Sequence, residues 1–185
     1  MVENTGFRNI AATNTSGLDI AIGYSQETSI GDFAVGLRGT YLIKNDFQAT
    51  PEAEVFSILD TVNRPIDLVL RGTLSWSKRG FTIFTAVNYD DSYTDNLYGG
   101  QFSADGKPIP VQVDAWTTVD FSLRYDSGAT FARGFLQDTT LSASVINIFD
   151  SDPPEIGEAN QFVRYDTGNA TALGRYIRLQ ISKRF

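Results

Sequence analysis

The stretch WTTVDFSLRY at residues 116–125 decides the fold class of this chain. Every second position from residue 117 to residue 125 is taken by Thr117, Val119, Phe121, Leu123 and Tyr125. The positions between them are taken by Thr118, Asp120, Ser122 and Arg124. Because successive side chains of a strand point to opposite faces, this alternation predicts a β-strand with one apolar and one polar face. It favours an antiparallel sheet whose two sides have different surroundings.

The same period of two recurs along the chain, at 18–24, 33–43, 66–76, 81–89, 141–145 and 177–185. No segment keeps a 3.6-residue period long enough to predict a helix. We therefore expect an all-β, antiparallel protein of about seven strands, with residues 1–185 forming one unit. An eighth strand within 7–14, where the alternation is poor, stays open.

The connections between these stretches alternate in length. Residues 26–31 and 77–80 are short connections, whereas 45–65, 91–114 and 150–174 are long and rich in Gly, Asn, Asp, Ser and Pro. The connection 126–137 is of intermediate length, where a short turn is expected. Tight turns at one end and long loops at the other are typical of bacterial outer-membrane barrels.

Composition excludes several classes of protein. The 185 residues include 15 Lys+Arg and 22 Asp+Glu, which gives a net charge of −7, with no His and no Cys. Without His and Cys there is no imidazole metal site, Ser-His-Asp triad, zinc finger or disulfide. The acidic balance argues against nucleic-acid binding. We expect no enzyme activity and no catalytic, cofactor-binding or metal-ligating residue.

Alternation alone does not say whether the apolar face meets lipid or the core of a soluble β-sandwich. Aromatic residues at the ends of the apolar stripes favour lipid, because such rings gather at bilayer interfaces: Tyr24, Tyr41, Trp76, Phe81, Tyr89 and Tyr125. The opposite face carries the charged residues Asp19, Arg38, Arg71, Asp120, Arg124 and Arg178. A cation on the lipid face costs about 2–4 kcal/mol at the midplane. Lys183 in the last stripe counts against lipid, although a lysine near the interface reaches water.

Four segments resemble strands of TonB-dependent outer-membrane receptors, in the order expected for that family. They are residues 87–96, 116–125, 144–154 and 174–185, of which 144–154 is similar to the family's strand end N-L-F-D-x-x-P. The resemblance implies a place in a 22-stranded barrel that encloses a plug. It further implies TonB-energised uptake of a scarce nutrient: a siderophore, cobalamin or an oligosaccharide.

The chain shows no signal peptide, plug or TonB box, so the resemblance implies the C-terminal part of a receptor. Its expected location is the outer membrane of a Gram-negative cell. Its expected partners are outer-membrane lipid, the rest of the barrel and plug, TonB through the missing N-terminal region, and a small-molecule nutrient. Seven strands leave two open edges, so we expect an open sheet that needs detergent and does not transport alone. The alternatives are a small self-contained outer-membrane barrel and a soluble β-sandwich binding module.

Several polar clusters are candidate sites, each with a simpler explanation. Asp90, Asp91, Tyr93 and Asp95 could hold Ca²⁺, but a solvated outer loop is the simpler interpretation. Asp150 and Asp152 precede Pro153-Pro154, which we expect to end a strand. Tyr98-Gly99-Gly100 and Tyr165-Asp166 fall in outer loops, and Lys78-Arg79 in a tight periplasmic turn. The four arginines of the polar face could contact a plug, but pairing with Asp19 and Asp120 is simpler.

Overall fold

The computed structural model describes residues 11–97, 102–107, 109–129, 134, 137–160 and 163–184. Within these ranges the regular secondary structure consists of β-strands and a single 3-10 turn, η1 (Ser127–Ala129). None of the helical structure described is long and apolar enough to cross a membrane.

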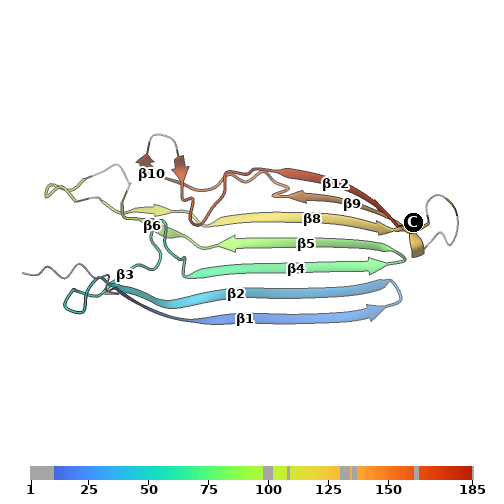
Figure 1. Cartoon of the computed structure of the whole chain (residues 1–185), viewed down its shortest axis with the longest axis horizontal. Coiled ribbons are helices and arrows are strands. Elements are labelled where there is room, and N and C mark those ends of the chain that lie inside the picture. The colour runs from blue at the N-terminus through green and yellow to red at the C-terminus, as the bar shows by residue number, and fades with distance from the viewer. Residues whose placement is uncertain are drawn as a thin grey trace, which may run out of the picture.

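Seven long antiparallel strands lie side by side and form what we call the wall (Figure 1). In spatial order they are β1 (Ala12–Thr28), β2 (Gly31–Gln48), β4 (Leu68–Lys78), β5 (Phe81–Asp90), β8 (Trp116–Asp126), β9 (Thr139–Ile146) and β12 (Tyr176–Lys183). Short β3 (Phe56–Ser57) pairs with the end of β2. The predicted all-β antiparallel fold is confirmed, and each of the seven alternating stretches supplies one strand.

Strand register places all seven apolar stripes on the same face of the wall. One row of paired residues crosses every strand: Tyr24, Val35, Leu74, Thr85, Phe121, Val145 and Ile177. The neighbouring row on the other face reads Ser25, Ala34, Ser75, Phe84, Ser122, Ser144 and Arg178. Since a one-residue slip in any strand would exchange its faces, the register itself keeps these two faces distinct. We call them the apolar face and the polar face.

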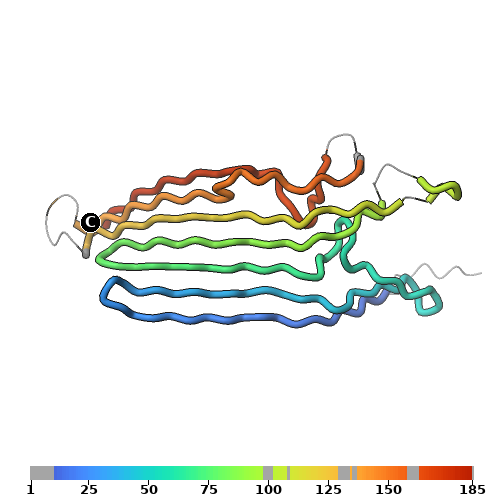
Figure 2. The backbone as a smooth tube through the Cα atoms, turned by 180° about the vertical axis from the view of Figure 1, so that it is seen from behind, coloured from blue at the N-terminus to red at the C-terminus, as the bar shows by residue number. Residues whose placement is uncertain are grey.

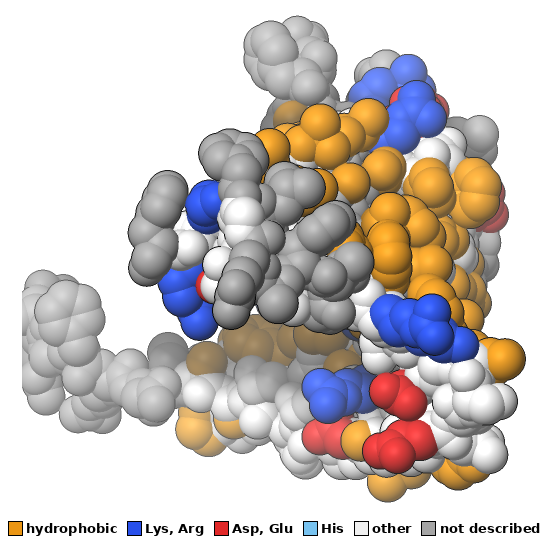
Figure 3. All heavy atoms as spheres, turned by 90° about the vertical axis from the view of Figure 1, so that its right-hand side faces the viewer, with side chains coloured by type: hydrophobic (Ala, Val, Ile, Leu, Met, Phe, Trp, Pro, Cys, Tyr) orange, Lys and Arg blue, Asp and Glu red, His pale blue; other side chains and the backbone are white. Residues whose placement is uncertain are grey.

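The apolar face has no second sheet over it among the described residues. Leu179 is 78% exposed, Ile22 64% and Leu74 49%. Seen from the end with the short turns, hydrophobic side chains gather over a large area on one side of the molecule (Figure 3). Within the described part of the chain, these side chains are therefore not the core of a β-sandwich.

The wall has a turn end and a loop end, as the connection lengths predicted. At the turn end, Arg79 and Gly80 link β4 to β5 with φ values of 48° and 84°. Two consecutive positive φ angles are characteristic of the type I′ hairpin turn, whose twist matches that of the strands. The three long connections lie together at the opposite end (Figure 2).

Several predicted boundaries were wrong. The first strand was predicted from residue 18 but begins at Ala12. The prediction was too short because a bulge between Ser16 and Gly17 interrupts the alternation. Residues 12–14 thus belong to this strand, and residues 7–10 of the possible eighth strand lie outside the described residues. Ile66 precedes β4 and is buried in the loops. Besides β3 in the first long loop, the other two long loops contain paired short strands: β6 (Tyr93–Asp95) with β7 (Val111–Val113), and β10 (Glu155–Asn160) with β11 (Val163–Tyr165).

The wall is open. β1 pairs only with β2, and β12 pairs only with β9, so each has one unpaired edge among the described residues. Both edge strands run from the loop end to the turn end, because seven antiparallel strands separate them by an even number of reversals. The two edges therefore cannot pair with each other as an antiparallel ladder.

Candidate functional site

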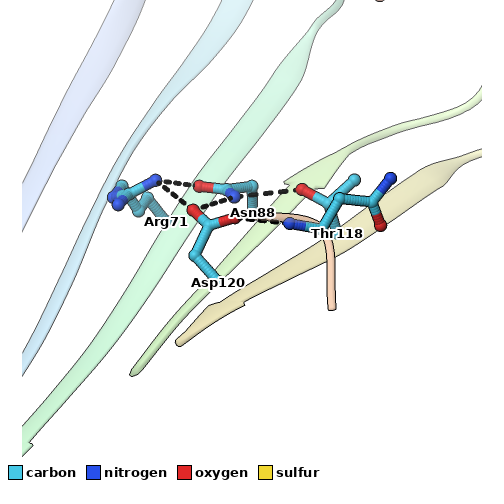
Figure 4. A network of polar contacts seen from close by, with 5 residues as sticks. Arg71, Asn88, Thr118 and Asp120 are labelled. Carbon is cyan, nitrogen blue, oxygen red and sulfur yellow. Dashed lines mark hydrogen bonds and ion pairs between the residues drawn. The ribbon is translucent and has the colours of Figure 1, made fainter. Parts of the chain in front are cut away.

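A polar network joins β4, β5 and β8 on the polar face, toward the loop end of these strands (Figure 4). Arg71 on β4 contacts the amide of Asn88 on β5, and its guanidinium lies 3.6 Å from the carboxylate of Asp120 on β8. Asn88 Nδ2 donates to Thr118 Oγ1 at 3.0 Å and to Asp120 Oδ2 at 3.2 Å. The network joins three neighbouring strands through their side chains and fixes the direction of the Asp120 carboxylate.

Cross-strand pairing of the predicted charges is confirmed in part. Arg71 pairs with Asp120 as expected. Asp19 instead accepts a hydrogen bond from Thr40 at 2.8 Å, and Arg124 lies 3.7 Å from Asp126 on its own strand. Arg178 donates to Gln180 at 2.9 Å. The expected position of Asp120 and Arg124 on one face is confirmed by the register.

Asn147 ends β9 and connects the network to the third long loop. Its backbone N–H donates to Asp120 Oδ1 at 3.1 Å, and its φ is 52°. Its side-chain amide exchanges two hydrogen bonds of 2.9 Å with the backbone of Ser151. The expectation that Pro153-Pro154 ends this strand was wrong, because the strand stops at Ile146, where Asn147 turns the chain.

The three long loops share a small buried core, which we call the cap. Its members come from all three connections: Val62, Ile66, Tyr93, Val113 and Ile156. Val62 and Val113 are each 2% exposed. Packing of this kind excludes water, so the loops form one body above the loop end of the wall.

Two buried carboxylates tie the loops of the cap together. Asp95, fully buried, accepts a hydrogen bond from Gly157 N at 2.8 Å, which joins the second loop to the third. Asp166, also fully buried, accepts from Asn63 N at 2.9 Å, Gly168 N at 2.8 Å and Asn169 Nδ2 at 2.8 Å. These donors offset the desolvation of each carboxylate.

Tyr93 lies beside Asp166 in the cap. Burial raises the pKa of the Tyr93 phenol above its ordinary value, and the charge of Asp166 and a hydrogen bond to it raise the pKa further. The phenol therefore stays protonated and donates to the carboxylate. Buried apolar packing and hydrogen bonds to buried carboxylates therefore join the three loops.

The predicted acidic cluster does not converge on one point. Asp91 accepts hydrogen bonds from Tyr89 Oη and Ser92 N, at 2.9 and 2.7 Å. Tyr93 and Asp95 are buried, so the expectation of a solvated loop was wrong for both. Within the described ranges, no group of three or more His, Cys, Asp or Glu side chains could hold a metal ion.

The other predicted sites separate into structural contacts. Asp150 accepts from Arg175 N at 2.6 Å and pairs with the Arg175 guanidinium at 3.7 Å. Lys78 and Arg79 occupy the predicted tight turn, where Lys78 Nζ donates to Ser29 O at 2.9 Å. Residues 98–100 lie outside the described residues.

Sequence reasoning missed the structural role of Asp166, which it placed in an exposed loop. The stretch Tyr165-Asp166-Thr167-Gly168-Asn169 does carry a local signal, since an Asp two residues before a Gly is typical of a side-chain-to-backbone turn. The partner Asn63 lies 103 positions away in sequence, so nothing local indicates that contact. Comparisons with protein-family models, curated proteins and solved structures found no match to this chain.

Proposed function

We propose that this chain is part of the wall of a TonB-dependent outer-membrane receptor, which imports a scarce nutrient such as a siderophore, cobalamin or an oligosaccharide. The observation that carries the proposal is the continuous, uncovered apolar face to which all seven strands contribute. In water so large an apolar surface is unfavourable, whereas in a bilayer it replaces lipid–lipid contact at no such cost.

Strand dimensions support a membrane-spanning wall. A tilted strand needs about 9–11 residues to cross the hydrocarbon layer. β4, β5 and β8 contain 11, 10 and 11 residues. β1 and β2 contain 17 and 18 residues and extend further toward the loop end. The segment formed by β4, β5 and β8 therefore matches the thickness of a bilayer, whereas β9 and β12 contain 8 residues each.

Aromatic side chains lie on the apolar face near both ends of that segment. Near the turn end, the rings of Phe81 and Tyr125 lie 4.5 Å apart, and Trp76 Nε1 donates to Ile30 O at 3.1 Å. Near the loop end, Tyr41 and Tyr89 occupy the same face. Rings with one polar atom are favoured at the boundary between hydrocarbon and headgroups.

The open edges support a place within a larger sheet. Unpaired N–H and C=O groups in hydrocarbon cost several kcal/mol each, so β1 and β12 require further strands if they lie in a bilayer. Transport by the whole receptor would depend on those strands and on a plug facing the polar side. The polar network and the ordered cap then lie on the lumen side and at the outer mouth.

Solubility tests the membrane part of the proposal. The purified chain should stay monodisperse in a non-ionic detergent and aggregate when the detergent is removed, as measured by size-exclusion chromatography with light scattering. A monomer that remains soluble without detergent would contradict the proposal.

The DNA upstream of the Met1 codon tests the receptor part. An in-frame stretch that encodes a plug and a signal sequence supports the receptor. A signal sequence alone, directly before this chain, supports a self-contained outer-membrane barrel instead. An in-frame stop codon followed by a ribosome-binding site would favour a soluble module.

A further inference from the structure

Two arginines lie directly opposite each other on the polar face. Arg38 on β2 and Arg71 on β4 are register partners. Side chains so placed start about 4.5–5.5 Å apart at Cβ, and like charges in this arrangement destabilise a sheet. An anion beside the pair would offset this repulsion.

Arg71 has such an anion at Asp120, 3.6 Å away. For Arg38, no carboxylate of the described residues lies within ion-pair distance. The nearby Asp19 carboxylate accepts a hydrogen bond from Thr40 at 2.8 Å. The Arg38 guanidinium is exposed, and its donors are available to a ligand.

A hollow of about 310 Å³ adjoins the pair. Its polar-face lining includes Gly23, Gly36, Arg38, Arg71, Thr73 and Ser75. The hollow exists because two strands place glycine there: Gly23 has open space where a Cβ would stand, and a Cβ on Gly36 would lie 2.8 Å from Thr73 Oγ1. The hollow thus combines a guanidinium, hydroxyl donors and room for a small group.

We infer that this hollow binds a small solute that carries a carboxylate or phosphate group, with Arg38 as the principal contact. A guanidinium offers paired N–H donors that match two oxygens of such a group. The Ser75 hydroxyl can donate as well, whereas the Thr73 hydroxyl donates to Gly36 O at 3.5 Å. The chain as a whole has a charge of −7, so general attraction of anions is unfavourable and binding requires a local site. The site depends on the polar face alone and does not require the apolar face to meet lipid.

Isothermal titration calorimetry with citrate tests the inference, using the full chain in a non-ionic detergent at about 10 mM ionic strength, where screening is weak. The unmodified chain should bind one citrate saturably. Arg38→Gln should weaken binding by at least about tenfold, the factor that corresponds to about 1.4 kcal/mol. Gly23→Leu should weaken binding as much, because its side chain occupies the hollow and its Cβ has open space around it.

Two matched variants control for charge and for glycine replacement. Arg124→Gln removes an arginine from the same face, and Gly72→Leu replaces a glycine of the apolar face that also has open space around it. Both should leave citrate affinity within about twofold, a change of about 0.4 kcal/mol. Absence of saturable binding, equal weakening by Arg124→Gln, or unchanged affinity in Gly23→Leu would each overturn the inference. Arg38 is exposed, so its variant keeps the test valid if Gly23→Leu fails to fold.

Discussion

The wall and the cap bury their apolar side chains in opposite ways. In the cap, Val62 and Val113 are almost fully enclosed by residues of the other loops. In the wall, Ile22 and Leu179 are more than half exposed although they belong to an ordered sheet. The cap is thus stabilised by its own core, whereas the wall has regular hydrogen bonding and no core of its own.

This difference indicates that the cap and the wall require different solvents. A region with its own core is stable in water through apolar burial. A sheet that exposes seven apolar stripes on one uncovered face must obtain that burial from outside the chain. We therefore expect substitutions in the cap to act in any solvent, and substitutions on the apolar face to act only in lipid.

Replacement of Ile66 should have the largest effect. Ile66→Ala leaves a cavity in the cap core, and such replacements cost about 2–5 kcal/mol. Hydrogen exchange should show faster exchange in the cap by the corresponding factor, with and without lipid, and little change in the wall. Leu173→Ala is the control, because Leu173 lies in the third loop and is 61% exposed. An equal effect of both substitutions would contradict the existence of a cap core.

A charge on the apolar face should have the next largest effect. Val87 lies on this face near the middle of β5, so Val87→Arg should lower the free energy of unfolding in lipid vesicles by about 2–4 kcal/mol. Ser122→Arg on the polar face should change it by less than about 0.5 kcal/mol, as surface substitutions do. Urea unfolding followed by tryptophan fluorescence measures both. Similar losses for the two variants would show that the faces do not differ in their surroundings.

The Tyr93 phenol should give the smallest effect, and one that depends on pH. Its pKa is raised in the folded cap, so the unfolded chain loses the phenol proton first as pH rises. The stability that the protonated phenol provides is complete below its unfolded pKa of about 10 and is lost as pH rises above that value. Tyr93→Phe should cost about 0.5–1.5 kcal/mol at pH 7 and remove this part of the alkaline loss.

The control for that measurement is Tyr165→Phe, since Tyr165 belongs to the third long loop and is only partly buried. Hydrogen exchange of cap amides between about pH 7 and pH 11 separates the two variants, since that range includes the unfolded pKa. An alkaline loss that persists unchanged in Tyr93→Phe would assign it to another group.

The wall could be predicted from sequence because each of its strands carries a local alternation of apolar and polar residues. Alternation in 116–125 needs no distant partner to be recognised, and the seven patterns then align on one face. The first strand was shortened in prediction because the bulge at Ser16 and Gly17 shifts the period by one residue. A local irregularity of this kind removes the only signal that a period-based argument uses.

The cap could not be predicted, because its contacts join residues far apart in sequence and follow no period. Ile66 was placed in a strand because it continues the alternation of β4, yet it packs against the loops. Asp95 was interpreted as solvated because its partner, Gly157, lies 62 positions away. Carboxylates in loops are usually exposed, and only tertiary contacts show which ones are buried.

The two tryptophans provide the most direct test of the central claim, that the apolar face meets lipid and the polar face does not. Trp76 lies on the apolar face, whereas Trp116 lies on the polar face opposite Asp90. Single-tryptophan chains made by Trp116→Phe and Trp76→Phe can be placed in vesicles whose acyl chains carry bromine, which quenches tryptophan fluorescence on contact. The account predicts strong quenching of Trp76 and weak quenching of Trp116. Equal quenching of the two, or protection of Trp76, would contradict it.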